Sequence, residues 1–348
     1  MIAVDVSTPC RLHFGLLRLA QPSGPQFGGL GMMIDRPRAA LRAAAADEWH
    51  VSGPQADRVQ AVAKQAIAAL GDDAAIQALR IEVQSAPPSH RGLGSGTQLA
   101  LAVAAAVRRL ARLPDGSADD LARMAARGTR SAVGSHGFVH GGLIWEQGQL
   151  EGDSLGQLTA RLAVPSTWRI VLIAPARGSG LSGHAEQAAF AELPPAPTDQ
   201  TRAMAALVEH HILPAVKQDD VESFGEAVHE YGRLSGELFA DVQGGPYASS
   251  KIARCVAAIR AAGVPGAGQS SWGPTVFAVV RGDQRARDLI DRLRTEAACR
   301  DCRFDVVAAD NVGAVIREAA DAGQLAGTTG TSGGTDSDGS PRRTPADG

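Results

Sequence analysis

A strand, a glycine-rich loop and a buried helix follow one another between residues 79 and 113. Leu79–Ser85 alternates apolar and polar side chains, which is typical of a half-buried strand. The loop runs from Pro87 to Thr97, and the segment after it is almost wholly Ala, Leu and Val as far as Leu113, as in a helix buried on all sides. This order is the most informative local pattern in the chain, and it favours a fold that mixes sheets with helices.

The loop Gly92-Leu93-Gly94-Ser95-Gly96-Thr97 has the chemistry of a phosphate site. Glycines let backbone N–H groups approach a phosphate, the two hydroxyls add donors or a magnesium-linked oxygen, and the following helix offers its positive end. The alternative is a plain turn into a helix. No Lys follows the last glycine, so the loop is not a Walker motif, and it comes too late in the chain to be a dinucleotide fingerprint.

Charge and length restrict the partners. The 348 residues correspond to about two domains. A formal net charge of −3 provides no bulk basic field for nucleic acid or anionic lipid. Only three of the 34 basic residues are Lys (Lys64, Lys217 and Lys251), so arginine must bind most anions.

The cysteines and the start of the chain indicate a cytoplasmic protein without a membrane segment. Four Cys cannot make a disulfide framework, and the first residues lack the basic and apolar regions of a signal peptide. No apolar run approaches the ~20 residues of a membrane span. Cys299 and Cys302 have metal or redox spacing, but without a second pair we expect two small buried residues.

The rest of the chain alternates strands, helices and two further glycine-rich regions, which we expect to be loops. Pro9 predicts a break between two early strands, and the segment after about Gly323 predicts a disordered tail. The expected helices are 54–70, 200–217, 221–239 and 247–262; the expected later strands are 143–145, 168–174, 275–280 and 304–308; and the glycine-rich regions are 134–142 and 263–274.

Five blocks of residues resemble the GHMP kinase superfamily and, within it, the β-ribofuranosylaminobenzene 5′-phosphate synthase family. The blocks are 11–16, 27–35, 92–99, 180–183 and 270–275, and the third of them is similar to the phosphate loop of homoserine and mevalonate kinases. The resemblance spans about residues 2–318. It implies an α+β, GHMP-kinase-like two-domain fold: a ribosomal-protein-S5-like domain at 1–165 and a ferredoxin-like domain at 166–322, followed by the tail at 323–348.

Two departures from the kinase pattern favour the synthase. GHMP phosphotransferases usually carry an Asp, the candidate base, before a Gly-Gly pair, and the matching stretch here, 131–142, contains no carboxylate. The third kinase motif, Gly-Ala-Gly-Gly-Gly, becomes Gly266-Ala267-Gly268-Gln269-Ser270-Ser271, with fewer glycines to admit a nucleotide. Both losses fit a protein that retains the fold and the pyrophosphate site without phosphoryl transfer.

The resemblance implies condensation of 5-phosphoribosyl 1-pyrophosphate with 4-aminobenzoate, releasing pyrophosphate and carbon dioxide, at the start of tetrahydromethanopterin synthesis. Pyrophosphate departure calls for positive charge and Mg²⁺, and the 5′-phosphate and carboxylate call for Arg or His. The catalytic candidates are Arg11, His13 and Arg91; the substrate-binding candidates are His90, Gly92, Gly94, Ser95, Gly96, Thr97, Ser135, His136, Ser182, Ser270 and Ser271; and the candidate metal ligands are Ser95 and Thr97.

Several of these residues also have a purely structural interpretation. Arg11 could be a solvated strand residue, and His136 and His140 could serve local hydrogen bonding in a loop. His184 could begin a helix. Asp35 could hold magnesium, but an Asp before Arg-Pro is more often a turn former.

The synthase is the leading interpretation, and two alternatives stay open. One is an ATP-dependent small-molecule kinase of the same fold, and the other is an inactive paralogue that binds a pterin precursor. The sequence does not decide between 4-aminobenzoate and 4-hydroxybenzoate as acceptor. A homodimer is expected because GHMP proteins are often dimers.

Overall fold

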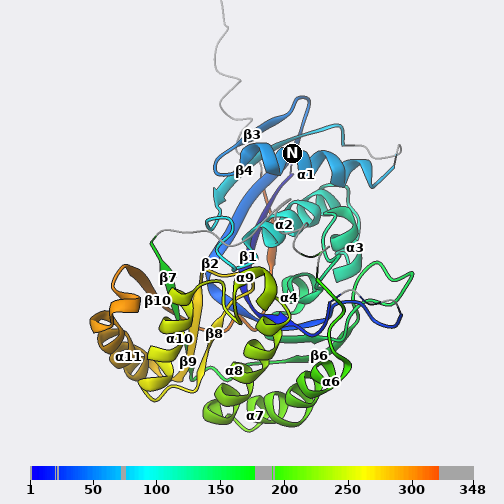
Figure 1. Ribbon diagram of the computed structural model, residues 1–348. Coiled ribbons are helices and arrows are strands. Elements are labelled where there is room, and N and C mark those ends of the chain that lie inside the picture. Colours follow the sequence, from blue (N-terminus) through cyan, green and yellow to red (C-terminus); the bar gives the residue numbers. More distant parts are fainter. Residues whose placement is uncertain are drawn as a thin grey trace, which may run out of the picture.

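The computed structural model describes residues 2–19, 21, 23–71, 76–176, 190 and 193–320. The described chain forms two sheets with helices packed against both (Figure 1). The expected tail lies outside the described residues.

The first sheet has seven strands in the order β11-β1-β2-β4-β3, with β5 and β6 continuing from β2. Its strands are β1 (Ile2–Leu16), β2 (Gly29–Ala46), β3 (His50–Ser52), β4 (Ala78–Ser85), β5 (Leu143–Glu146), β6 (Leu158–Leu162) and β11 (Val315–Ala320). All neighbouring pairs are antiparallel except β3 with β4. The last strand therefore returns to the first sheet, although its residues fall within the second expected domain.

Among the described residues, four helices belong with this sheet: α1 (Ala56–Ala68), α2 (Ser95–Leu110), α3 (Ala118–Met124) and α4 (Val133–His140). The buried face of α2 includes every residue from Gln98 to Val107, as its apolar composition predicts. It packs on β1, β2 and α1. The stretch expected as a loop at 134–142 instead contains α4, because its glycines alternate with buried side chains such as Phe138 that pack into the core.

The second sheet has the order β10-β7-β9-β8 and is wholly antiparallel. Its strands are β7 (Trp168–Pro175), β8 (Gly266–Gln269), β9 (Val276–Arg281) and β10 (Cys302–Val307). The described part of this half contains the helices α6 (Thr198–Leu207), α7 (Leu213–Lys217), α8 (Val221–Glu237), α9 (Ala240–Gln243), α10 (Ser250–Ala261) and α11 (Asp283–Thr295), together with a short π-helix, η1 (Val208–Ile212), and a 3₁₀-helix, η2 (Ala297–Cys299).

Both faces of the second sheet are buried, and side chains of β7 point alternately to one face and the other. Trp168, Ile170 and Leu172 belong to a core shared with α6 and α8, while Val171 and Ile173 belong to a core shared with α10 and α11. Since successive side chains of a strand point to opposite faces, one strand supplies both cores. The sheet is a middle layer between helices (Figure 1).

Strand β1 joins the two halves. Its residues Val4 and Val6 lie in the core of the first sheet, and Leu12 and Phe14 lie in the core that contains α8. The expected break at Pro9 is wrong: the strand continues, and the register to β2 shifts between Pro9 and Cys10. A proline has no N–H to donate, and the bulge accommodates it within one strand.

No helix in the described part of the chain is long and apolar enough to cross a membrane.

Candidate active site

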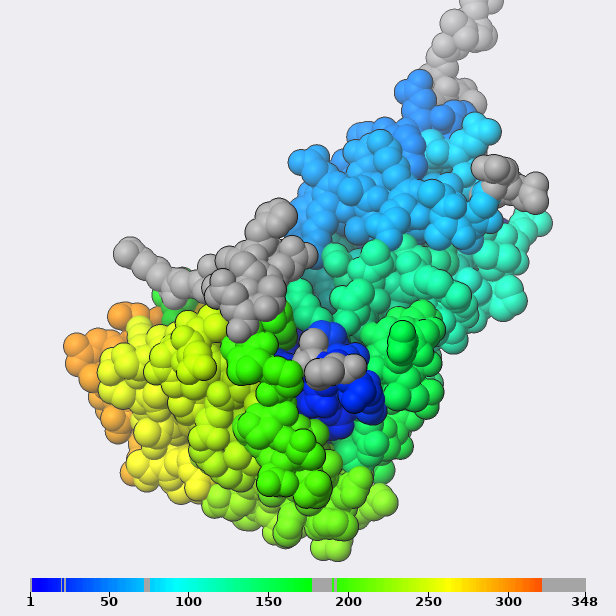
Figure 2. All heavy atoms as spheres, turned by 45° about the vertical axis from the view of Figure 1, so that its right-hand side comes forward, coloured from blue at the N-terminus to red at the C-terminus, as the bar shows by residue number. Residues whose placement is uncertain are grey.

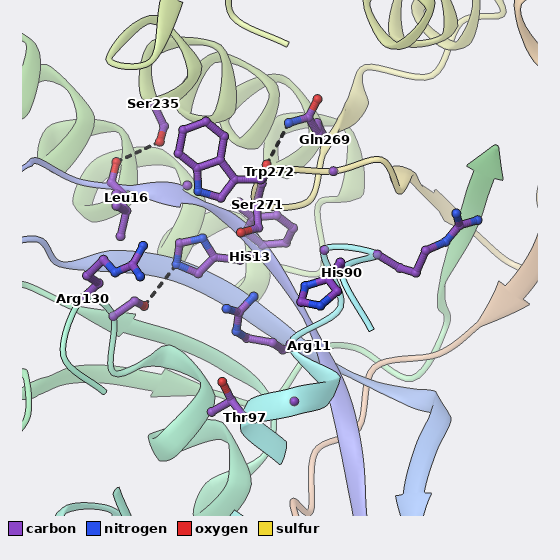
Figure 3. A pocket seen from close by; sticks show the side chains of 18 of the residues that line it. Arg11, His13, Leu16, His90, Thr97, Arg130, Ser235, Gln269, Ser271 and Trp272 are labelled. Carbon is purple, nitrogen blue, oxygen red and sulfur yellow. Dashed lines mark hydrogen bonds between the residues drawn. The ribbon is translucent and has the colours of Figure 1, made fainter. Parts of the chain in front are cut away.

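A cavity of about 600 Å³ lies where β1, the glycine-rich loop and the second half of the chain meet. Figure 2 shows residues near the end of β1, in dark blue, between green later parts of the chain. The lining comes from β1, from the loop at 89–97, from residues 126–131, from α8 and the residues after it, and from 269–273. Figure 3 shows its side chains pointing toward one another from these separate elements.

The predicted phosphate loop leads directly into α2. His90, Gly92 and Gly94 all have positive φ, and the helix begins at Ser95 without a side-chain cap. The first N–H groups of a helix have no partner within it, and Gly94 to Thr97 line the cavity. The backbone N–H of Arg11 donates to the carbonyl of Leu93 at 3.0 Å, which fixes the loop against β1.

Ser270 fixes the opposite side of the loop. Its hydroxyl donates to the carbonyl of Gly92 at 2.7 Å and accepts from the backbone N–H of His13 at 3.0 Å. The N–H of Ser271 also donates to the carbonyl of His13 at 2.9 Å. A Cβ on Gly92 would lie 2.3 Å from the Ser270 carbonyl oxygen, so only glycine fits where the two loops touch. Ser270 therefore orders the site without lining the cavity.

Arginines surround the loop. The side chain of Arg11 lies against Gly94, and the guanidinium of Arg58 lies over Gly96. Arg91 donates to the carbonyl of Pro175. The cavity is lined by Arg11, Arg58, Arg91, Arg127 and Arg130, and no Asp or Glu stands among its described lining residues.

Two of these arginines repel each other. Burial lowers the pKa of Arg127, and the nearby charge of Arg58 lowers the same pKa further. The Nε of Arg127 is buried without a hydrogen-bond partner in the described structure. Like charges held close together favour a bound anion, because an anion relieves their repulsion.

His13 lines the cavity, and a buried acid, Glu146, lies behind the cavity wall. His13 Nε2 is 3.1 Å from the hydroxyl of Ser131, and burial together with the charge of Arg11 lowers the pKa of His13 well below its usual value. Glu146 accepts from the N–H groups of Ala132 at 3.0 Å and of Gly148 at 2.9 Å. Burial raises the pKa of Glu146 to about 7, and these donors and the Ser131 hydroxyl oppose that rise.

Most of the predicted site residues come together in this cavity. The lining includes Arg11, His13, His90, Arg91, Gly92, Gly94, Ser95, Gly96, Thr97 and Ser271. Ser135 and His136 do not line it; both lie on α4, where the ring of His136 bonds to the carbonyl of Gly156 at 2.8 Å. Ser182 and His184 lie outside the described residues.

Sequence reasoning missed several lining residues. Arg58 lies on α1, and Arg127, Arg130 and Ser131 lie in the connection between α3 and α4, with no local motif to single them out. The scarcity of lysine was the one signal that pointed to arginine. Three aromatic lining residues, Phe190, Phe239 and Trp272, were also missed.

Asp35 and the cysteine pair both lie outside the main cavity. Asp35 accepts from the backbone N–H of Ala308 at 2.9 Å and lies away from the main cavity, which fits a structural role. Cys299 is buried beside Cys255, with 3.1 Å between the sulfurs, and Cys302 is only half-buried. In the described part of the chain no cluster of three or more His, Cys, Asp or Glu could hold a metal.

The domain models and the curated relatives that this chain matches agree on its family. Residues 58–142 match the model of the GHMP kinases N terminal domain, and residues 212–299 match that of the GHMP kinases C terminal domain. The chain is 30% identical over 331 residues to beta-ribofuranosylphenol 5′-phosphate synthase of Archaeoglobus fulgidus, covering 89% of this chain and 98% of the relative. It is 29% identical over 301 residues to the protein of that name from Methanothermobacter thermautotrophicus, covering 80% and 89%.

Solved structures share the fold at low identity. The phosphomevalonate kinase of Streptococcus pneumoniae superposes with a TM-score of 0.66 at 16% identity, covering 89% of this chain and 100% of that one. The homoserine kinase of Cytophaga hutchinsonii gives 0.65 at 17% identity, covering 90% and 97%. The expected α+β, GHMP-kinase-like fold is confirmed.

Proposed function

Because the chain belongs to the β-ribofuranosylphenol 5′-phosphate synthase family, we propose that it joins C1 of 5-phosphoribosyl 1-pyrophosphate to the ring of a 4-substituted benzoate. The relatives are synthases, and the chain is accordingly an enzyme of the transferase class. The relatives' name specifies a phenol product, which corresponds to 4-hydroxybenzoate as acceptor. With 4-aminobenzoate the same reaction yields the aminobenzene product.

The charge of the cavity is the observation that carries this proposal. Five arginines and the first turn of α2 face a space without a described carboxylate, and both proposed substrates are anions. Pyrophosphate is the group that the loop and the arginines Arg11, Arg58 and Arg127 suit best, since backbone N–H groups and forked guanidinium groups both bind phosphate oxygens.

The residues present fit Mg²⁺ held mainly by the substrate. The hydroxyls of Ser95 and Thr97 line the cavity, and no described carboxylate does. Mg²⁺ commonly binds through substrate phosphates with few protein ligands. When bound, the ion would neutralise charge on the departing pyrophosphate.

The bond changes balance without a strong base. The ring carbon that bears the carboxylate forms a bond to C1 while the bond from C1 to the pyrophosphate oxygen breaks. The bond from the ring to the carboxylate then breaks, its electron pair restores the aromatic ring, and carbon dioxide leaves. The arginines stabilise the negative charge that grows on pyrophosphate, and the lowered pKa of His13 keeps it neutral near pH 7, available as a hydrogen-bonding group.

The kinase alternative has less support. Residues 131–142 lack the Asp that GHMP kinases carry, and Glu146, which approaches this stretch from β5, is buried behind Ser131 and Ala132 and does not line the cavity. A phosphotransferase base must reach the hydroxyl of its acceptor.

Product analysis tests the proposal. The purified protein is incubated with 5-phosphoribosyl 1-pyrophosphate, Mg²⁺ and carboxyl-labelled 4-hydroxybenzoate or 4-aminobenzoate, without ATP. We expect labelled carbon dioxide and pyrophosphate in equal amounts, and a chelator should stop both. If neither benzoate reacts and ATP is consumed with an alcohol acceptor, the kinase alternative is correct.

A further inference from the structure

The cavity has a second, aromatic end. Trp272, Phe239 and Phe190 line it and pack edge to face, with ring centroids 4.7 Å apart for Trp272 and Phe239 and 5.7 Å apart for Trp272 and Phe190. Phe239 is 8% exposed, and Trp272 is half-buried. A cavity wall made of aromatic rings suits a flat apolar ligand.

This wall is built onto the phosphate-loop end. Trp272 follows Ser271, whose N–H donates to the carbonyl of His13, and the same turn touches Gly92 through the carbonyls of Ser270 and Gly273. Figure 3 shows Trp272 beside His13, with Arg11 further toward Thr97. A ligand on the rings therefore lies next to a ligand on the loop.

We propose that Trp272 and Phe239 form the binding subsite for the aryl carboxylate acceptor, with the carboxylate-bearing carbon directed toward the phosphate loop. This inference rests on the proposed function, which requires one aromatic and one phosphorylated substrate in contact. Arg11 and Arg58 lie against the loop and attract the carboxylate toward that end of the cavity. Arg130 lies over the ring of Phe190, 4.4 Å from its centroid. The ring itself rests on the aromatic wall, so the ring carbon that attacks faces ribose C1.

The arrangement also fits the departure of carbon dioxide. The arginines orient the carboxylate through their field and need not pair with it, because a carboxylate held tightly by a guanidinium is stabilised in its charged form, which opposes decarboxylation. A subsite that binds mainly the ring places binding energy on a part of the substrate that does not change charge. Affinity for the acceptor should therefore depend on the aromatic wall.

Equilibrium dialysis with labelled 4-hydroxybenzoate and 4-aminobenzoate tests the subsite without turnover. Mg²⁺ and inorganic pyrophosphate are present to occupy the loop end. Trp272→Leu and Phe239→Leu should each weaken benzoate binding roughly tenfold, whereas Trp272→Phe should stay within about threefold. Trp49→Leu is the matched control, since Trp49 is also half-buried but packs beside Lys64 on α1.

Pyrophosphate affinity serves as the check on folding and should be unchanged in all four variants. Wild-type affinity for benzoate in both leucine variants would overturn the subsite and leave the proposed function standing. A wild-type protein that binds pyrophosphate but neither benzoate would overturn both.

Discussion

Replacing Glu146 with Gln should remove part of the decrease in the free energy of unfolding that occurs as the pH rises toward neutrality. The carboxyl is 1% exposed, and burial raises its pKa from an ordinary value of 4.5 to about 7. The folded chain therefore holds this proton more tightly than the unfolded chain, and folding takes up a proton between these two pH values. The stability contributed by the protonated group is complete below the unfolded pKa and is lost as the pH rises through the folded pKa.

The two pKa values set the size of the effect. Between about pH 5.5 and pH 7.5 the free energy of unfolding should fall by about 2 kcal/mol from this group alone. Glutamine does not titrate, so the variant lacks that contribution. Subtracting the variant's curve from the wild-type curve removes the titration of the histidines, several of which have lowered pKa values and act in the opposite direction.

Urea unfolding at a series of pH values measures this difference. Glu82→Gln is the control, because Glu82 is an exposed carboxylate on β4. The wild-type minus Glu146→Gln difference should decline with pH more steeply than the wild-type minus Glu82→Gln difference over the same range. A flat difference for Glu146→Gln would show that the carboxyl titrates as it does in water and that its burial is compensated by its donors.

Three further predictions concern the loop and its arginines. Gly94→Val should abolish pyrophosphate binding in a folded protein, because the side chain would displace Arg11 and strain a backbone with φ near 65°. Gly71→Val is the control, since its φ is near 83° and the space around it is open. Equal pyrophosphate binding by both variants would show that the loop at 92–97 does not bind phosphate. Arg11→Lys should lower kcat/KM about tenfold, or ~1.4 kcal/mol, since the planar fork is lost, and unchanged kinetics would place Arg11 outside the binding site. Arg127→Gln should weaken pyrophosphate binding at least about tenfold in calorimetry, because a positive charge is lost from the cavity. Without pyrophosphate the Tm should not fall, because the substitution relieves repulsion from Arg58. A lower Tm would show that Arg127 stabilises the fold instead.

The parts of the fold that depend on local pattern could be predicted from sequence. The strand at 78–85 and the helix at 221–237 lie within a residue or two of the expected bounds, and the helix at 95–110 lies within about three, because each has clear periodicity or a glycine or proline beside it. The pairing of β11 with β1 could not be predicted, since it joins segments some 300 residues apart and nothing in Val315–Ala320 specifies its partner. Strand pairing depends on tertiary packing and not on local propensity.

The candidate site divides in the same way. The loop residues and Arg11 were identified because they belong to short contiguous motifs, and they do line one cavity. Arg58 is brought to the loop from α1 by packing, and a single sequence has no signal that connects it with the loop. Trp272 lies in the block 270–275 that resembles the family, but only Ser270 and Ser271 of that block were singled out as site residues. His136 was expected in a glycine-rich loop, either contacting substrate or hydrogen bonding to the protein. The segment is helical, and the ring of His136 bonds to the carbonyl of Gly156, which fits the second role.

The missing kinase carboxylate has a physical counterpart in the structure. An acid that faced this cavity would compete with the substrates for the arginines and would weaken the field that binds two anions together. Glu146 contributes a carboxylate close to the same segment, but Ser131 and Ala132 separate it from the cavity, and burial keeps its pKa near neutrality. The described cavity thus retains a strongly positive wall, which would stabilise departing pyrophosphate in the proposed reaction. In the proposed function, this charge together with the glycine-rich loop suits the site to a substrate that carries pyrophosphate.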